Sequence, residues 1–252
     1  MNEYILEFIS ENDFERHLEQ TIKEYNQVLK SVNLKKFNSN IIDPIKLLFD
    51  KNVFNKSYED IIRLEIQRQR DKSNNNIIGY FHQNIFKYFN CCEVPEEYWD
   101  VIYKPNCGDT YYVEIKNKHN TMNSSSSAKT YMKFQNHLLT SDDRGNSICA
   151  LVEIIAKESQ DKEWVIAIDK SKQNPNARLR RISIDKFYEI VTGDKEAFKK
   201  LCIQLPITIE KIISEQETLQ AQEDTVIEEL LEIDKNTLMA LYKLAFKTYE
   251  GF

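Results

Sequence analysis

Residues 98–116 read YWDVIYKPNCGDTYYVEIK, and this stretch decides the fold class. Two segments rich in aromatic and β-branched residues, 98–103 and 110–116, flank the turn-forming residues KPNCGD. The pattern predicts a β-hairpin with Asp100 in its first strand and with Glu114 and Lys116 in its second. Because side chains alternate along a strand, Glu114 and Lys116 share one face, and the turn can bring Asp100 opposite them.

Helical periodicity surrounds this hairpin. Apolar spacing predicts a helix over 12–32 with Asn12 and Glu15 as a capping box, a helix from Pro44, and helices over 58–70 and 77–89 separated by a break at DKSNNN, 71–76. After the hairpin we expect a helix over 127–139, two apolar, central strands over 147–156 and 163–169, a short strand over 178–184, and helices from 185. The residues expected on the apolar face of the 127–139 helix are Ala128, Tyr131, Met132, Gln135, Leu138 and Leu139.

These elements predict an α/β fold in which a mixed central sheet is flanked by helices, with helical additions at both ends. We expect a single domain that consists of a helical N-terminal region over 1–72, an α/β core over 73–184 and a helical C-terminal region over 185–252. The hydrophobic fraction of 41% is sufficient for a substantial core.

The charge distribution is more informative than the net charge of −6. Residues 116–141 contain four lysines and no acid, and residues 170–181 contain five basic residues and no acid. An acidic protein with two such segments is suited to binding a polyanion on one face, while its net charge argues against a generally basic nucleic-acid binder.

Targeting signals and metal-binding cysteine patterns are not found in the sequence. The first residues lack the basic region of a signal peptide, and no apolar run approaches the roughly 20 residues of a membrane-spanning helix. The five cysteines are scattered without a C-x-x-C motif, which favours reduced thiols in a cytoplasmic protein over a zinc site.

Asp100, Glu114 and Lys116 are the residue types that phosphodiester hydrolysis requires. One or two carboxylates can hold Mg²⁺, and a nearby lysine can position or deprotonate the attacking water and neutralise growing charge. Glu114-Ile115-Lys116 is the only acid-x-Lys triplet in the chain. The alternative is that Glu114 and Lys116 are solvent-facing neighbours on an amphipathic strand.

With these residues in place, the chain resembles the PD-(D/E)xK nuclease superfamily. The stretch EIKNKHNTMNSSSSAKTYMKFQ (114–135), and more faintly GYFHQNIF (79–86), YWDVI (98–102) and ALVEII (150–155), is similar to type II restriction endonucleases that cleave GGNCC-type palindromes. Trp99 stands where the superfamily motif has proline. The resemblance implies that Asp100, Glu114 and the Ile115 carbonyl bind Mg²⁺, that Lys116 acts on the attacking water, and that Glu65 or Gln83 supplies a further ligand.

A catalytic Glu114 and Lys116 would place the following residues along DNA. We expect Lys118, His119, Asn120 and Asn123 to donate to phosphates or base edges, residues 124–127, beginning with Ser124, to cap the next helix, and Lys129 and Lys133 to extend the contact. The alternative is an ordinary solvated loop with a helix cap. Three arginines, Arg178, Arg180 and Arg181, are candidates for reading guanines, for contacting phosphate or for a salt-bridge network.

The resemblance implies a Mg²⁺-dependent endonuclease that cuts both strands of double-stranded DNA at a GC-rich palindrome and leaves 5′-phosphates. Palindrome symmetry predicts a homodimer, with the contact built by the helical N- or C-terminal region, and the family pairs with a DNA methyltransferase that protects the same site. Two alternatives stay open from the residues alone. They are a structure-specific nuclease of DNA repair or recombination and a non-catalytic DNA-binding protein on the same fold.

Overall fold

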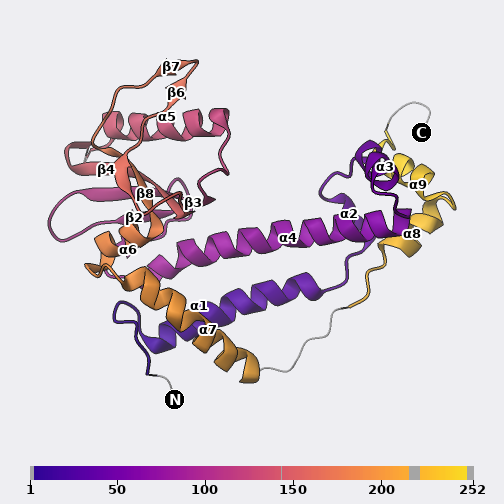
Figure 1. Cartoon of the computed structure of the whole chain (residues 1–252), viewed down its shortest axis with the longest axis horizontal. Helices are drawn as coiled ribbons and strands as arrows, with labels where there is room; N and C mark the ends of the chain where they lie inside the picture. Colours follow the sequence, from indigo (N-terminus) through magenta and orange to yellow (C-terminus); the bar gives the residue numbers. More distant parts are fainter. Residues whose placement is uncertain (1–2, 143, 216–221, 249–252) are drawn as a thin grey trace. The chain divides into compact units, whose positions relative to one another are not determined.

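The computed structural model describes residues 3–142, 144–215 and 222–248, and the chain divides into two compact units. Unit 1 takes its residues from Met1–Thr21 and Ile78–Gln216, and unit 2 from Ile22–Ile77 and Glu217–Phe252. Two helices, α1 (Glu11–Asn26) and α4 (Tyr58–Asn84), each contribute residues to both units (Figure 1). The expectation that the whole chain is one domain, with regions over 1–72, 73–184 and 185–252, stays a prediction.

Unit 1 contains a six-stranded mixed sheet with the order β1-β2-β3-β4-β8-β5. Its strands are β1 (Cys92–Glu93), β2 (Val101–Tyr103), β3 (Thr110–Lys118), β4 (Ser147–Ile155), β5 (Asp161–Glu163) and β8 (Leu179–Ser183). The three central strands β3, β4 and β8 are parallel, whereas β1, β2 and β5 pair antiparallel at the two edges. A separate hairpin pairs β6 (Ala167–Ile168) with β7 (Ser171–Lys172).

Helices cover both faces of this sheet (Figure 1). On one face α5 (Ser124–Thr140) packs Tyr131, Phe134 and Leu138 against a cluster that includes Cys149, Leu151, Trp164 and Leu179. On the other side lie α6 (Ile184–Thr192) and α7 (Ala197–Glu215), and buried rings of α6 contact Phe86 in the short 3₁₀ turn Ile85–Tyr88. Further 3₁₀ turns span Gln27–Leu29 and Arg144–Asn146.

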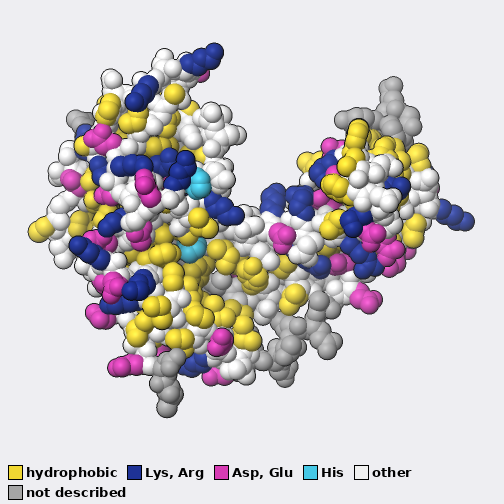
Figure 2. All heavy atoms as spheres, viewed as in Figure 1, with side chains coloured by type: hydrophobic (Ala, Val, Ile, Leu, Met, Phe, Trp, Pro, Cys, Tyr) yellow, Lys and Arg dark blue, Asp and Glu magenta, His cyan; other side chains and the backbone are white. Residues whose placement is uncertain are grey.

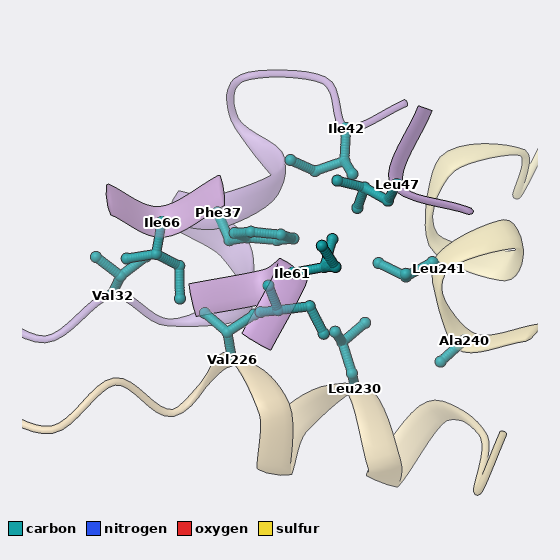
Figure 3. Packing of buried hydrophobic residues seen from close by; sticks show 11 residues of the cluster. Val32, Phe37, Ile42, Leu47, Ile61, Ile66, Val226, Leu230, Ala240 and Leu241 are labelled. Carbon is teal, nitrogen blue, oxygen red and sulfur yellow. The ribbon is translucent and has the colours of Figure 1, made fainter. Parts of the chain in front are cut away.

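Unit 2 is helical. Besides its parts of α1 and α4 it contains α2 (Leu34–Asn38), α3 (Pro44–Val53), α8 (Val226–Ile233) and α9 (Thr237–Ala245). Figure 3 shows its core, in which aliphatic side chains of these helices surround the ring of Phe37. An ion pair between Arg70 and Asp224, 2.8 Å long, also ties α4 to the segment that precedes α8.

The predicted fold class and hairpin are confirmed. Val101 pairs with Val113 in an antiparallel ladder, and the buried Val113 and Ile115 alternate with the partly exposed Glu114 and Lys116. The first strand is shorter than expected, because Tyr98 has a φ of 71°, which lies outside the β region and ends the extended backbone before Val101.

Several sequence expectations about elements are wrong. The first helix runs from Glu11 to Asn26 and not to residue 32, and Ser10 replaces Asn12 at its start, since the Asp13 N–H donates to Ser10 Oγ at 3.1 Å. The run 71–76 does not break a helix: α4 continues through it, and the side chains of Ser73 and Asn75 donate to backbone carbonyls one turn earlier. Residues 163–169 are not a central strand: β5 lies at the sheet edge, and the buried Trp164 follows it. On α5, Met132 and Leu139 are exposed, and the unpredicted Phe134 fills the core instead.

Within the described residues, no helix combines the length and the apolar character needed to cross a membrane.

Candidate nuclease site

The hairpin brings Asp100, Glu114 and Lys116 together. The Asp100 backbone N–H donates to the Val113 carbonyl at 2.9 Å, and the Ile115 N–H donates to Asp100 Oδ2 at 2.7 Å. Asp100 is therefore fixed beside the two residues that flank Ile115 in β3. Lys116 Nζ donates to Glu114 Oε2 at 3.2 Å. The structure thus places the three predicted residues at one point of the sheet.

A fourth side chain, Lys133 of α5, also contacts this group. Its ammonium pairs with Glu114 Oε1 and donates to the Tyr98 carbonyl, and it lies 4.2 Å from the centroid of the Trp99 ring. Each carboxylate oxygen of Glu114 therefore faces a lysine. The helix that brings Lys133 here is anchored by its buried Tyr131 and Phe134.

Burial raises the pKa of Asp100 above its ordinary value. The Ile115 N–H and the ammonium groups of Lys116 and Lys133 act in the opposite direction, and the neighbouring Glu114 carboxylate adds to the rise. The carboxylates of Asp100 and Glu114 repel each other, so a cation between them would lower the energy of the state in which both are ionised.

The oxygen donors at this point fit a hard divalent cation. Mg²⁺ prefers carboxylate and carbonyl oxygens and usually retains water, so two carboxylates and the Ile115 carbonyl are a sufficient protein contribution. No cluster of three or more His, Cys, Asp or Glu side chains with metal-ligand geometry occurs in the described part of the chain. The site would therefore be one in which substrate and water complete the coordination, rather than an all-protein cage.

The two candidates for a further ligand lie in different units. Glu65 belongs to unit 2. Its carboxylate accepts a hydrogen bond from Arg68 Nε at 2.7 Å and another from Gln69 Nε2 at 3.1 Å. Gln83 belongs to unit 1, near the end of α4. Their part in metal binding stays a prediction.

The polar segment after β3 leads into α5. Lys118 and Asn120 are exposed, and the His119 N–H donates to the Ile155 carbonyl at 3.0 Å. Asn123, not the serines, caps α5: its Oδ1 accepts from the Ser126 N–H at 2.8 Å, so the helix begins at Ser124, three residues before the expected start. Lys129 is exposed on the same helix.

Arg180 and Arg181 of β8 have carboxylate partners. Arg181 pairs with Glu153 of β4 at 2.6 Å and donates to the His119 carbonyl at 3.3 Å, and Arg180 Nε donates to Asp161 Oδ1 at 2.8 Å. These contacts form a salt-bridge network, which was one of the alternatives that the sequence allowed for the arginines. Arg178 Nα donates to the Asn176 side chain at 3.0 Å. For all three, contact with DNA stays a prediction.

Glu153 was not identified from the sequence. It is 2% exposed and lies beside Lys116 in the parallel register of β3 and β4. The register also places Glu114 beside Leu151, and Leu151 beside Arg181. Because Leu151 packs against α5, the charged side chains of Glu114 and Arg181 lie on the face of the sheet that α5 covers. An acid within the apolar run SICALVEIIA was the available signal, since a buried carboxylate requires a partner. On the face shown in Figure 2, basic side chains gather over the unit that carries the sheet, with acidic ones among them.

Comparison with known proteins adds independent findings. Residues 6–214 match the sequence profile of a family described as Eco47II restriction endonuclease. The chain is 33% identical over 218 residues to the type II restriction enzyme Sau96I of Staphylococcus aureus, which covers 83% of this chain and 81% of that enzyme. It is 30% identical over 225 residues to the type II restriction enzyme Eco47II of Escherichia coli, which covers 84% of this chain and 90% of that enzyme.

Proposed function

Since the chain belongs to the Eco47II restriction endonuclease family and is a type II restriction enzyme, we propose that it hydrolyses both strands of double-stranded DNA at a short GC-rich palindrome of the GGNCC type. Cleavage requires Mg²⁺ and leaves 5′-phosphates. The single observation that carries this proposal is the convergence of Asp100, Glu114 and Lys116 at the hairpin.

Each residue of this group has a distinct role in the proposed reaction. The carboxylates of Asp100 and Glu114, with the Ile115 carbonyl, bind the Mg²⁺ ion. When bound, the ion would act as a Lewis acid and stabilise the charge that develops on the scissile phosphate. Lys116 orients the attacking water and takes part in its deprotonation, and the hydrogen bond from the Ile115 N–H holds Asp100 at a fixed distance from Glu114.

DNA binds along the acid-free segment 116–141, which begins at the end of β3. The exposed Lys118, Asn120 and Lys129 contact the phosphate backbone, and the N-terminus of α5 at Asn123 and Ser124 adds partial positive charge. His119 lies in the same segment as a candidate base contact. The absence of acids between 116 and 141 supports this path, because a carboxylate there would repel phosphates.

Recognition of a palindrome implies two identical readings of the site. A two-fold homodimer provides one active centre for each strand, and a DNA methyltransferase with the same specificity protects the host DNA without needing to bind this protein.

Digestion of a sequenced plasmid tests the proposal. The purified protein is incubated with plasmid in Mg²⁺ or in EDTA, and the ends of the fragments are sequenced and tested for ligation. We expect discrete fragments whose ends map to one GGNCC-type sequence and which ligate without added phosphate, and no cutting in EDTA. A random ladder, nicking confined to junctions or flaps, or 5′-hydroxyl ends would contradict the proposal.

A further inference from the structure

Lys133 connects α5 to both strands of the catalytic hairpin. Its ammonium contacts Glu114 Oε1 in β3 and the Tyr98 carbonyl just before β2, and it lies over the Trp99 ring, 4.2 Å from the centroid. Glu114 is a proposed metal ligand, and Tyr98 and Trp99 immediately precede the other one, Asp100. One side chain therefore contacts the segments that carry both carboxylates.

The backbone at Tyr98 has a conformation that needs such support. Its φ of 71° is unfavourable for a residue with a large side chain, and the residue is 79% exposed, so side-chain packing does not hold it. The hydrogen bond from Lys133 fixes the carbonyl of this strained residue. Two residues later the Asp100 N–H joins the β3 ladder at Val113, so a shift at Tyr98 would move Asp100.

The charges at the site are balanced only if Lys133 is included. Asp100 and Glu114 carry two negative charges, and Lys116 and Lys133 carry two positive ones. The side chain of Glu114 is 16% exposed and has one lysine at each oxygen. A carboxylate held from both sides loses rotamer freedom, which fixes the position of its oxygens before substrate arrives.

The same contacts argue against Lys133 as a phosphate contact. Its ammonium has three donors, and the Glu114 carboxylate and the Tyr98 carbonyl already accept from it. Lys129, one turn earlier on α5, is exposed. The two lysines, which the sequence treated alike, are therefore in different situations.

We propose that Lys133 is a positioning residue, which fixes Glu114 and the 98–100 segment in the geometry required for cleavage and does not bind the DNA backbone. This inference rests on the proposed function of the site. It assigns to α5 a direct part in arranging the catalytic carboxylates.

The test compares four variants with the wild type. Lys133→Met keeps the apolar stem over Trp99 and removes the ammonium, and Lys133→Arg keeps the charge and several donors. Lys129→Ala serves as the comparator for a phosphate contact, and Asn136→Ala, exposed on α5, controls for changes to the helix. Measurements are kcat and KM for cleavage, the salt dependence of DNA binding in EDTA, and the midpoint of thermal unfolding.

We expect Lys133→Met to lower kcat by about 10- to 100-fold, because a small misplacement of catalytic groups has effects of this size, while KM stays near the wild-type value. Its slope of log K against log salt should equal that of the wild type, whereas Lys129→Ala should make the slope shallower by about 0.9. Lys133→Arg should recover part of the lost kcat, and Asn136→Ala should match the wild type throughout.

Three results would overturn the inference. One is an unchanged kcat in Lys133→Met. Another is a raised KM with a shallower salt slope, which would make Lys133 a DNA contact. The third is a Lys133→Arg variant that is folded and as inactive as Lys133→Met. If Lys133→Met lowers the unfolding midpoint by more than about 5 °C, Lys133→Gln is scored in its place by the same criteria.

Failure of this inference can be distinguished from failure of the proposed function. If Glu114→Gln abolishes cleavage and Lys133→Met does not slow it, only the role of Lys133 is wrong. If Glu114→Gln cleaves like the wild type, the assignment of the catalytic site itself is wrong.

Discussion

Three catalytic candidates could be identified from the sequence because each constraint on them is local. Alternation along a strand put Glu114 and Lys116 on one face, and a turn of the right composition returned the chain past Asp100. The contacts of Lys133 could not be predicted in this way. They depend on how α5 packs across the sheet, and helical spacing only places Lys133 one turn from Lys129, which is equally consistent with a shared phosphate contact.

His82 gives a pH-dependent prediction at the residue scale. Its ring is largely buried, Nδ1 has no hydrogen-bond partner in the described part of the chain, and burial, with a smaller effect of His17, lowers its pKa to about 4. The folded state therefore binds fewer protons than the unfolded state. The contribution of the neutral ring to stability is complete above the ordinary pKa of 6.5 and is lost as the pH falls towards 4.

We expect His82→Leu to weaken this dependence. Between pH 7 and pH 5 the free energy of unfolding of the wild type should fall by about 1–2 kcal/mol more than that of the variant. Urea unfolding at both pH values measures the difference. Parallel losses in the two proteins would show that His82 is protonated without cost in the folded state.

At the scale of elements, the sequence identified the strands that alternate or are uniformly apolar, and missed elements defined by tertiary contacts. The hairpin and the 147–155 strand were predicted because pattern and environment agree. The run 163–169 is as apolar as a central strand, yet Trp164, Ile166 and Ile168 reach the α5 cluster from the segment that follows the edge strand β5. The polar run 71–76 resembles a loop in composition, but an exposed helix has no need of apolar residues there.

The Glu153–Arg181 ion pair joins β4 to β8 and gives the prediction at this scale. Arg181→Met would leave the buried Glu153 carboxylate without its cation, so the free energy of unfolding should fall by about 3 kcal/mol. The double variant Glu153→Leu, Arg181→Met should recover most of this loss. Chemical unfolding of the three proteins provides the measurement.

Arg180→Met is the matched control, because Arg180 pairs with Asp161 of the edge strand β5, and both side chains are more exposed than Glu153. A loss of about 0–1 kcal/mol is expected there. If Arg181→Met kept wild-type stability and weakened DNA binding, Arg181 would be a DNA contact and not a structural residue.

At the scale of the whole molecule, family membership decides between the alternatives that the residues left open. A restriction enzyme agrees with the intact acids and lysine, and neither a repair nuclease nor a non-catalytic binding protein is needed to explain them. The proposed catalytic residues all belong to unit 1. The sequence could not predict that the units would share α1 and α4, because periodicity within a helix does not indicate where its contacts change from one core to another.

The proposed symmetry of cleavage makes a prediction about assembly. The chain has a mass of 29.8 kDa, and we expect sedimentation equilibrium to give twice this value in the presence of a duplex that carries one site, after subtraction of the DNA. Duplex without the site, at the same concentration, is the control. A monomer that cuts both strands in one binding event would contradict the proposed two-fold arrangement.

The central claim is that the carboxylates of the hairpin carry out cleavage, and single-turnover cutting of a duplex with one site tests it most directly. Asp100→Asn, Glu114→Gln and Lys116→Met are compared with the wild type. The control is Glu93→Gln, because Glu93 is an exposed acid that pairs with Lys104, just after the neighbouring strand β2. The account predicts a rate lower by about a hundredfold or more in each of the three, with unchanged DNA binding in EDTA, and a wild-type rate in the control. A wild-type rate in Glu114→Gln would contradict it.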